Sequence, residues 1–142
     1  RTHIGLPTVS KLLKELQQLG FDIWAISGSN KWSVYPVFER LGIPRDRIIG
    51  IGLHLSSNVF AAKVETPVPV LQGKVEAVQQ FTNASPVLVV SDSIYDIPLF
   101  EYSSGLKVLV NSRMETSYTF FKETNIVQDD SWVVIEHPTL QE

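Results

Sequence analysis

The chain has 142 residues, of which 44% are hydrophobic and 19% charged, and a formal net charge of −3. This length predicts one domain over residues 1–142 with a real hydrophobic core, and the composition is ordinary for a globular protein. The charge, without a basic cluster, argues against nucleic-acid or membrane partners, no apolar stretch could span a bilayer, and the absence of cysteine excludes thiolate chemistry.

Hydrophobic spacing predicts two helices and two strands in the first half of the chain. Residues 8–19 carry apolar side chains at helical spacing, and these form one stripe that should face the core. Pro36 suits the first turn of the second helix. The expected elements are, in order, a helix over 8–19, a strand over 21–26, a helix over 33–41, a strand over 48–55 and an extended, partly exposed stretch over 58–69.

A small polar loop, Ser27-Gly28-Ser29-Asn30, follows the strand at 21–26. Such a loop between a strand and a helix can form an anion cradle, in which backbone N–H groups and the helix dipole point at a phosphate. The same residues also suit a simple turn that caps the next helix. Taken alone, this stretch favours the capping turn.

The second half of the chain continues the alternation of helices and strands. Val87–Val90 is an uninterrupted aliphatic run, which is typical of a strand buried on both faces of a parallel sheet. The whole order predicts an α/β fold, with a parallel sheet covered by helices on both faces. The expected elements are a helix from Gln72, a strand over 87–90, a helix after Asp96 to about residue 102, a strand over 106–110, a helix that contains Tyr118 and Phe121, and a strand over 132–135.

Two acidic residues, Asp92 and Asp96, follow the strand at 87–90. Ligands of open α/β sheets bind at the carboxyl ends of the strands. Two carboxylates on a tight loop there can bind one hard cation such as Mg²⁺ and leave positions for water and phosphate oxygens. The alternative is that both acids only close the turn and cap the next helix, where Pro98 suits the first turn.

Lys74 stands in the first turn of the helix that Gln72 opens. A cation in this position opposes the helix dipole, at a cost of a few tenths to about 1 kcal/mol. A lysine that reaches toward a phosphate would offset this cost. A solvated surface lysine is the common alternative.

Together these residues resemble the haloacid dehalogenase (HAD) superfamily, most closely its phosphoserine-phosphatase-like and phosphocholine-phosphatase-like branch. The second family motif, an apolar strand that ends in Ser or Thr, is matched by W-A-I-S-G-S-N with Ser27. The third, a lysine at a helix start, is matched by Q-G-K-V-E-A-V with Lys74. The fourth, an acidic pair after an apolar strand, is matched by S-D-S-I-Y-D with Asp92 and Asp96. The resemblance covers roughly residues 5–111.

The resemblance implies a Rossmann-like three-layer sandwich with a mostly parallel sheet. It also implies a Mg²⁺-dependent phosphomonoester hydrolase that works through a phosphoaspartyl intermediate on a small phosphorylated metabolite. In this scheme Ser27 and the Gly28 amide would hold a phosphoryl oxygen, and Asn30 would support their loop. A cytoplasmic location is expected.

The same resemblance gives the remaining residues their roles. Lys74 would neutralise the developing charge and hold the nucleophile. Asp92 would ligate Mg²⁺, and Asp96 would be a second ligand or an acceptor for the waters of the metal.

The first family motif, D-x-D-x-[TV], has no match, because the sequence contains no D-x-D. In the family its first Asp is the nucleophile and its second is the general acid/base. The HAD core is therefore expected to be incomplete at the N-terminus, with the first strand and the cap domain upstream of Arg1, and the chain alone is expected to be inactive.

In the family the absent strand lies between the strand that ends at Ser27 and the strand that ends at Ser91. Because neighbouring strands lie about 4.7–4.9 Å apart, its loss would leave a slot roughly 10 Å wide. Each unsatisfied backbone group buried there would cost on the order of 1–3 kcal/mol. We therefore expect a bound upstream peptide, direct pairing of the two strands, or strand exchange with another copy.

Two other functional classes fit parts of the sequence. One is a catalytically inactive HAD-like module that binds a partner or ligand, which an upstream D-x-D-x-[TV] would argue against. The other is a nucleotide-binding Rossmann-like domain, but no G-x-G-x-x-G follows any predicted strand.

Overall fold

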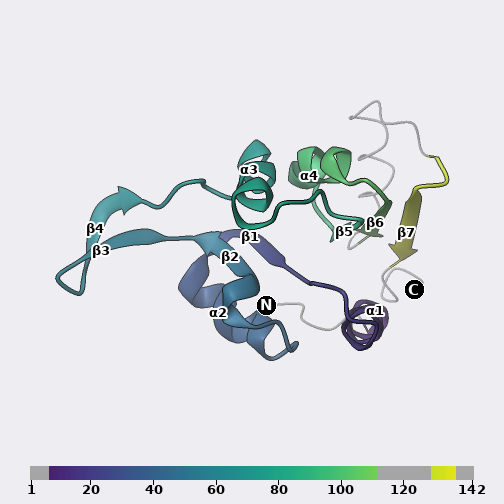
Figure 1. The fold of residues 1–142 in the computed structure, drawn as a ribbon, viewed down its shortest axis with the longest axis horizontal. Coiled ribbons are helices and arrows are strands. Elements are labelled where there is room, and N and C mark those ends of the chain that lie inside the picture. The colour runs from purple at the N-terminus through teal and green to yellow at the C-terminus, as the bar shows by residue number, and fades with distance from the viewer. Residues whose placement is uncertain (1–6, 112–128, 137–142) are drawn as a thin grey trace. The chain divides into compact units, whose positions relative to one another are not determined.

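The computed structural model of the chain describes residues 7–111 and 129–136. It divides into two units, Arg1–Val70 and Leu71–Glu142, each of which is described by itself (Figure 1). The predicted helix with Tyr118 and Phe121 lies outside the described residues. In the part of the chain that is described, no helix combines the length and apolar character needed to cross a bilayer.

The first unit is built on a strand–helix–strand motif. Strands β1 and β2 are parallel, and strands β3 and β4 form an antiparallel hairpin. Helix α2 connects β1 to β2. The elements are α1 (Pro7–Gln18), β1 (Ala25–Asn30), α2 (Lys31–Glu39), a 3-10 turn η1 (Arg45–Arg47), β2 (Ile48–Ile51), β3 (Leu53–Ser56) and β4 (Val59–Val64).

A small apolar cluster forms the core of this unit. Its buried members come from β1, α2, the turn after α2 and β2: Ala25, Val34, Ile43 and Ile48. Helix α1 contributes less than its sequence predicts, because none of its side chains is buried. Leu13 packs against the core, whereas Leu19, just beyond the helix, is 73% exposed. The predicted core-facing stripe of this helix is therefore only partly confirmed.

The start of β1 corrects the predicted strand over 21–26. Parallel pairing with β2 begins at Ala25, opposite Ile48, so residues 21–24 lie outside the ladder. The Asp22 side chain is held by other groups: its Oδ1 accepts from Arg47 Nε at 2.7 Å and its Oδ2 from Trp24 Nε1 at 3.0 Å.

Helix α2 begins two residues earlier than predicted, at Lys31. The reason is an N-cap, since Asn30 Oδ1 accepts a hydrogen bond from the Trp32 backbone N–H at 2.9 Å. Pro36 consequently lies inside the helix and not in its first turn.

The predicted strand over 48–55 is two strands, β2 and β3, with a break at Gly52. The stretch over 58–69, predicted as extended, contains β4, which pairs with β3. The hairpin is attached to the start of α2 by two contacts. Lys31 Nζ lies 2.6 Å from Glu65 Oε2, and the rings of Trp32 and Phe60 meet edge to face at 4.7 Å.

The second unit is a parallel sheet with two helices. The sheet order is β5-β6-β7, and both pairings are parallel. Helix α3 packs beside α4 (Figure 1). The elements are α3 (Gln72–Phe81), β5 (Leu88–Ser91), a 3-10 turn η2 (Ile94–Asp96), α4 (Ile97–Tyr102), β6 (Leu106–Asn111) and β7 (Trp132–Glu136).

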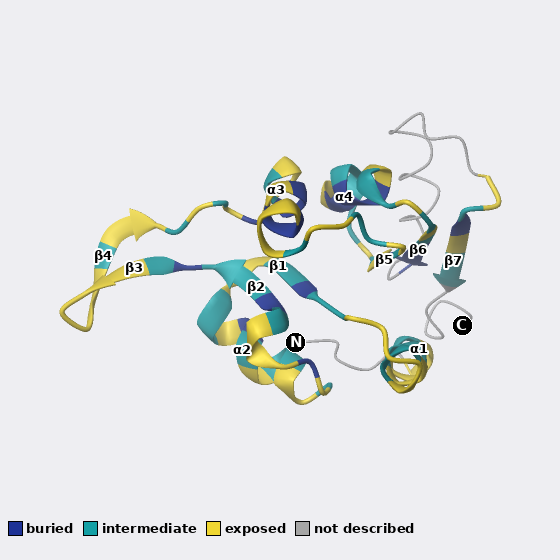
Figure 2. Ribbon diagram, viewed as in Figure 1, coloured by how far each residue is buried: buried dark blue, intermediate teal, exposed yellow. Residues whose placement is uncertain are grey.

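The core of the second unit lies between these helices and strand β6 (Figure 2). Phe100 and Leu109 are fully buried, and the Phe100 ring contacts that of Trp132 with their centroids 5.1 Å apart. The α/β fold class with parallel sheets is thus confirmed.

The predicted slot concerns the free edges of β1 and β5. Among the described residues, β1 has one hydrogen-bonded neighbour, β2, and β5 has one, β6. Because β1 belongs to the first unit and β5 to the second, direct pairing of the two strands also stays a prediction. A bound upstream peptide and strand exchange stay predictions.

Gly105 allows the chain that leads into β6 to pass close to the backbone of Val87, the residue before β5. A Cβ at this position would overlap the Val87 carbonyl oxygen, which accepts the Leu106 N–H at 2.9 Å. We expect Gly105→Ala to lower the free energy of unfolding by roughly 1–3 kcal/mol, as measured by urea denaturation. Gly28→Ala is the matched control, since its Cβ would meet only ordinary contacts at 3.5 Å and beyond. Equal stabilities of the two variants would contradict the expectation.

Asp22 makes the stability of the first unit depend on pH. The hydrogen bond from Arg47, with a further one from Trp24, holds the pKa of the Asp22 carboxyl below its usual range. A lowered carboxyl pKa contributes stability above the unfolded-state pKa of about 4, and this contribution is lost as the pH falls through the folded-state value. We expect Asp22→Asn to flatten the fall in melting temperature below about pH 4. Salt at about 1 M should shrink the difference, because these groups are largely exposed.

Candidate functional site

Lys74 is buried in the first turn of α3, with 9% of its surface exposed. It belongs to the inward face of this helix, next to Val75 and Val78. Its ammonium Nζ lies 2.6 Å from Asp96 Oδ1. The structure therefore rules out the alternative of a solvated surface lysine.

Asp96 is the partner of this lysine and is itself only 6% exposed. Its Oδ2 accepts a hydrogen bond from Ser91 Oγ at 2.6 Å. Its Oδ1 accepts no hydrogen bond of regular geometry from the described residues, so the Lys74 charge is what compensates for burying it. Asp96 stands at the N-cap position of α4, as predicted, but its side chain makes no capping bond. The carboxylate is bound to Lys74 and Ser91 instead.

The loop between β5 and α4 is closed by its own serines. Ser91 Oγ also accepts from the Ser93 backbone N–H at 3.2 Å, and Ser93 Oγ accepts from the Tyr95 N–H at 3.2 Å. Within this loop Asp92 is exposed, whereas Asp96 is buried. The two acids of the predicted metal pair therefore lie in opposite environments.

Asp92 has the chemistry that a magnesium site requires. It follows β5 directly, and its exposed carboxylate offers the hard oxygen ligands that Mg²⁺ prefers. Within residues 7–111 and 129–136 no group of three or more His, Asp or Glu side chains is gathered in a way that could hold a metal. Asp92 and Asp96 are thus the carboxylates that this part of the chain offers at the end of β5.

The predicted phosphate loop lies in the first unit, at the carboxyl end of β1. Ser27 Oγ accepts from the Ser29 N–H at 3.1 Å, and Asn30 caps α2. The capping turn that the sequence favours is therefore confirmed. It does not compete with the phosphate role, because the Ser27 hydroxyl still has its hydrogen to donate. Gly28 is exposed.

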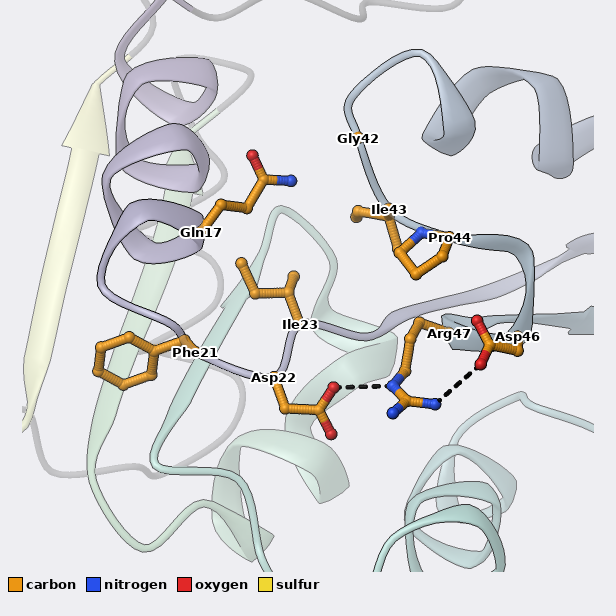
Figure 3. Close-up of a pocket in the computed structure, with 9 residues that line it drawn as sticks. All are labelled: Gln17, Phe21, Asp22, Ile23, Gly42, Ile43, Pro44, Asp46 and Arg47. Atoms are coloured by element: carbon orange, nitrogen blue, oxygen red, sulfur yellow. Dashed lines mark hydrogen bonds and ion pairs between the residues drawn. The ribbon is translucent and has the colours of Figure 1, made fainter.

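A cavity of about 280 Å³ lies in the first unit beside the residues that precede β1 (Figure 3). Phe21 and Ile23 form part of its wall, and Arg47 crosses it between Asp22 and Asp46 with contacts of 2.7 and 3.2 Å. No predicted site residue lines this cavity. Its lining residues are Gln17, Phe21, Asp22, Ile23, Gly42, Ile43, Pro44, Asp46 and Arg47.

The structure thus brings Lys74 into contact with Asp96 and places Asp92 on the same loop, all in the second unit. The Ser27 loop belongs to the first unit, so its meeting with Lys74 in one site stays a prediction. Sequence reasoning missed Ser91. The available signal was a hydroxyl residue at the end of an apolar strand, which is the same signal that singles out Ser27.

Residues 2–103 match the model of a family described as haloacid dehalogenase-like hydrolases. Among solved structures, the chain is similar to a protein of unknown function from Bordetella pertussis Tohama I, with a TM-score of 0.73 and 16% identity over 91% of this chain and 57% of that one. It is also similar to a phosphoserine phosphohydrolase-like protein from Francisella tularensis subsp. tularensis SCHU S4, with a TM-score of 0.59 and 20% identity over 76% and 51%.

A third similar structure is a phospho-aspartyl intermediate analogue of phosphoserine phosphatase, with a TM-score of 0.58 and 19% identity over 90% of this chain and 56% of that one. The chain therefore spans about half the length of these three structures. A comparison with curated proteins gave no significant match.

Proposed function

The chain belongs to the haloacid dehalogenase-like hydrolase family, and we propose that the whole protein is a Mg²⁺-dependent phosphatase of small phosphorylated metabolites. The observation that carries this proposal is the buried Lys74–Asp96 pair beside the exposed Asp92 at the carboxyl end of β5. Two of the similar structures are named after phosphoserine, which supports a phosphomonoester as the substrate class.

Lys74 supplies the fixed positive charge in this proposal. Phosphoryl transfer needs positioning and charge neutralisation more than further covalent chemistry. The Asp96 carboxylate holds the ammonium 2.6 Å away, next to the end of β5, where ligands of parallel sheets bind. A charge that is already in place there stabilises the transition state without reorganisation.

Asp92 would hold the Mg²⁺, with Asp96 acting through the waters of the metal. When bound, Mg²⁺ supplies charge neutralisation and orientation for the phosphoryl group. Ser27 would donate its hydroxyl hydrogen to a phosphoryl oxygen, with help from the Gly28 amide. The Asn30 cap keeps their loop joined to the start of α2.

The nucleophile of this mechanism comes from outside the sequence described here. A phosphoaspartyl route requires a carboxylate that attacks phosphorus, and the family takes it from a D-x-D motif that these 142 residues do not contain. The isolated chain is then inactive.

The test is hydrolysis of p-nitrophenyl phosphate by the whole protein and by the 142-residue chain. We expect turnover by the whole protein that EDTA removes and added Mg²⁺ restores, and only background turnover by the chain. Turnover by the chain that Lys74→Ala abolishes would contradict the missing nucleophile. A whole protein that hydrolyses no phosphomonoester would favour an inactive HAD-like module.

A further inference from the structure

Of the two aspartates on the loop from Ser91 to Asp96, one is exposed and the other is buried, and the Ser91 hydroxyl binds the buried one. We propose that Ser91 is a positioning residue: it keeps Asp96 on Lys74 and thereby leaves Asp92 as the carboxylate that binds the cation directly. This inference rests on the proposed function for the role of the cation, but its structural half is independent of it.

Ser91 is held by the pairing of its backbone in the sheet and by two hydrogen bonds of its hydroxyl group. It is the last residue of β5 and stands opposite Leu109, a fully buried residue of β6. Its Oγ accepts the Ser93 N–H, which directs the hydroxyl hydrogen away from the loop backbone. That hydrogen is donated to Asp96 Oδ2 over 2.6 Å, a short distance typical of a bond to a charged acceptor.

Each oxygen of the Asp96 carboxylate has its own partner. Oδ1 faces the ammonium and Oδ2 faces the hydroxyl. With both oxygens engaged and the side chain buried, Asp96 is held back from direct coordination. Asp92, four residues earlier, has no such partner among the interactions of the described residues and is exposed.

Removal of the hydroxyl frees Oδ2 and changes no charge. Asp96 could then add a second carboxylate to the cation site, and carboxylate count raises the affinity of such sites. For Ser91→Ala we therefore expect Mn²⁺, used as the probe, to bind the whole protein about tenfold more tightly in electron paramagnetic resonance titrations. Ser91→Cys, which keeps the volume but has only a weak donor, is the second variant and should behave in the same way.

Two controls separate positioning from general stability. Ser91→Thr keeps the hydroxyl and should retain the wild-type Mn²⁺ affinity. In an Asp96→Asn background, Ser91→Ala should no longer change the affinity, because the carboxylate that it releases is gone. The proposal would be overturned if Ser91→Ala and Ser91→Cys changed the Mn²⁺ affinity by less than about twofold. It would also be overturned if Ser91→Ala changed the affinity equally in the wild-type and Asp96→Asn backgrounds.

A second readout needs no metal. The Lys74 ammonium, held in a buried ion pair, should give a slowly exchanging ¹⁵N signal that Lys74→Arg identifies. This signal should be weak or absent in the Ser91→Ala variant and present in the Ser91→Thr variant. An unchanged signal in Ser91→Ala would overturn the positioning role. A wild-type protein without Mn²⁺ binding, in which the signal still depends on Ser91, would count against the proposed function and support the positioning of Asp96.

Discussion

Replacement of Lys74 by methionine should lower the free energy of unfolding by about 3–5 kcal/mol, because it leaves a buried carboxylate without its counter-charge. The Lys74 and Asp96 side chains are 11% and 8% exposed, so water cannot take over the role of the lost ammonium. The Ser91 hydroxyl would remain as a hydrogen-bond donor to Asp96, but it carries no charge. The effect should be visible as an earlier midpoint in urea denaturation of the whole protein.

The double variant Lys74→Met/Asp96→Leu tests the cause of this loss. When both charges are replaced by apolar groups, the penalty of the unpaired charge disappears, and most of the lost stability should return. Lys11→Met on the exposed side of α1 is the matched control and should change the stability by less than about 0.5 kcal/mol. If the double variant is no more stable than Lys74→Met, the ion pair is not the source of the loss.

Asp92→Asn should leave the fold intact and lower turnover by roughly 100-fold or more. A bound metal contributes several kcal/mol of charge stabilisation to phosphoryl transfer, and each 1.36 kcal/mol corresponds to about a tenfold change in rate. Because Asp92 is exposed, its stability contribution should stay within about 0.5 kcal/mol.

The measurement is a titration of phosphatase activity with Mg²⁺, run in parallel with urea denaturation. Asp130→Asn, an exposed aspartate before β7, is the control and should retain wild-type activity. We expect Asp92→Asn to need more Mg²⁺ and to reach a lower maximum. An unchanged Mg²⁺ titration would remove Asp92 from the cation site.

The sequence alone determined the α/β class and the order of the elements outside the β3–β4 hairpin. These follow from local physics: the aliphatic run Val87–Val90 favours a strand, and the apolar spacing from Gln72 onward favours a helix with one buried face. The expectation that this run is buried on both faces is wrong, because β5 begins at Leu88 and Val87 and Val90 are exposed. The sequence also placed Lys74 at the start of a helix and the two acids after a strand, because motif positions are set by such local boundaries.

Contacts between distant residues decided where strands begin and what they pair with. β1 starts at Ala25 because its ladder partner Ile48 stands there, a fact that no local pattern in residues 21–26 contains. The break at Gly52 is likewise a change of partner, from β1 to β4. The apolar stripe of α1 stays partly exposed because the buried core of the first unit is formed by residues of β1, α2, the following turn and β2.

Only the tertiary structure separated Asp92 from Asp96. Both are aspartates on one short loop, and their spacing gives no reason to expect that one of them, and not the other, binds the metal directly. The difference arises from α3, which brings Lys74 to Asp96, and from the end of β5, where Ser91 binds the same carboxylate. A buried charge needs a partner, and that partner lies 22 positions away in the chain, beyond the reach of any local pattern.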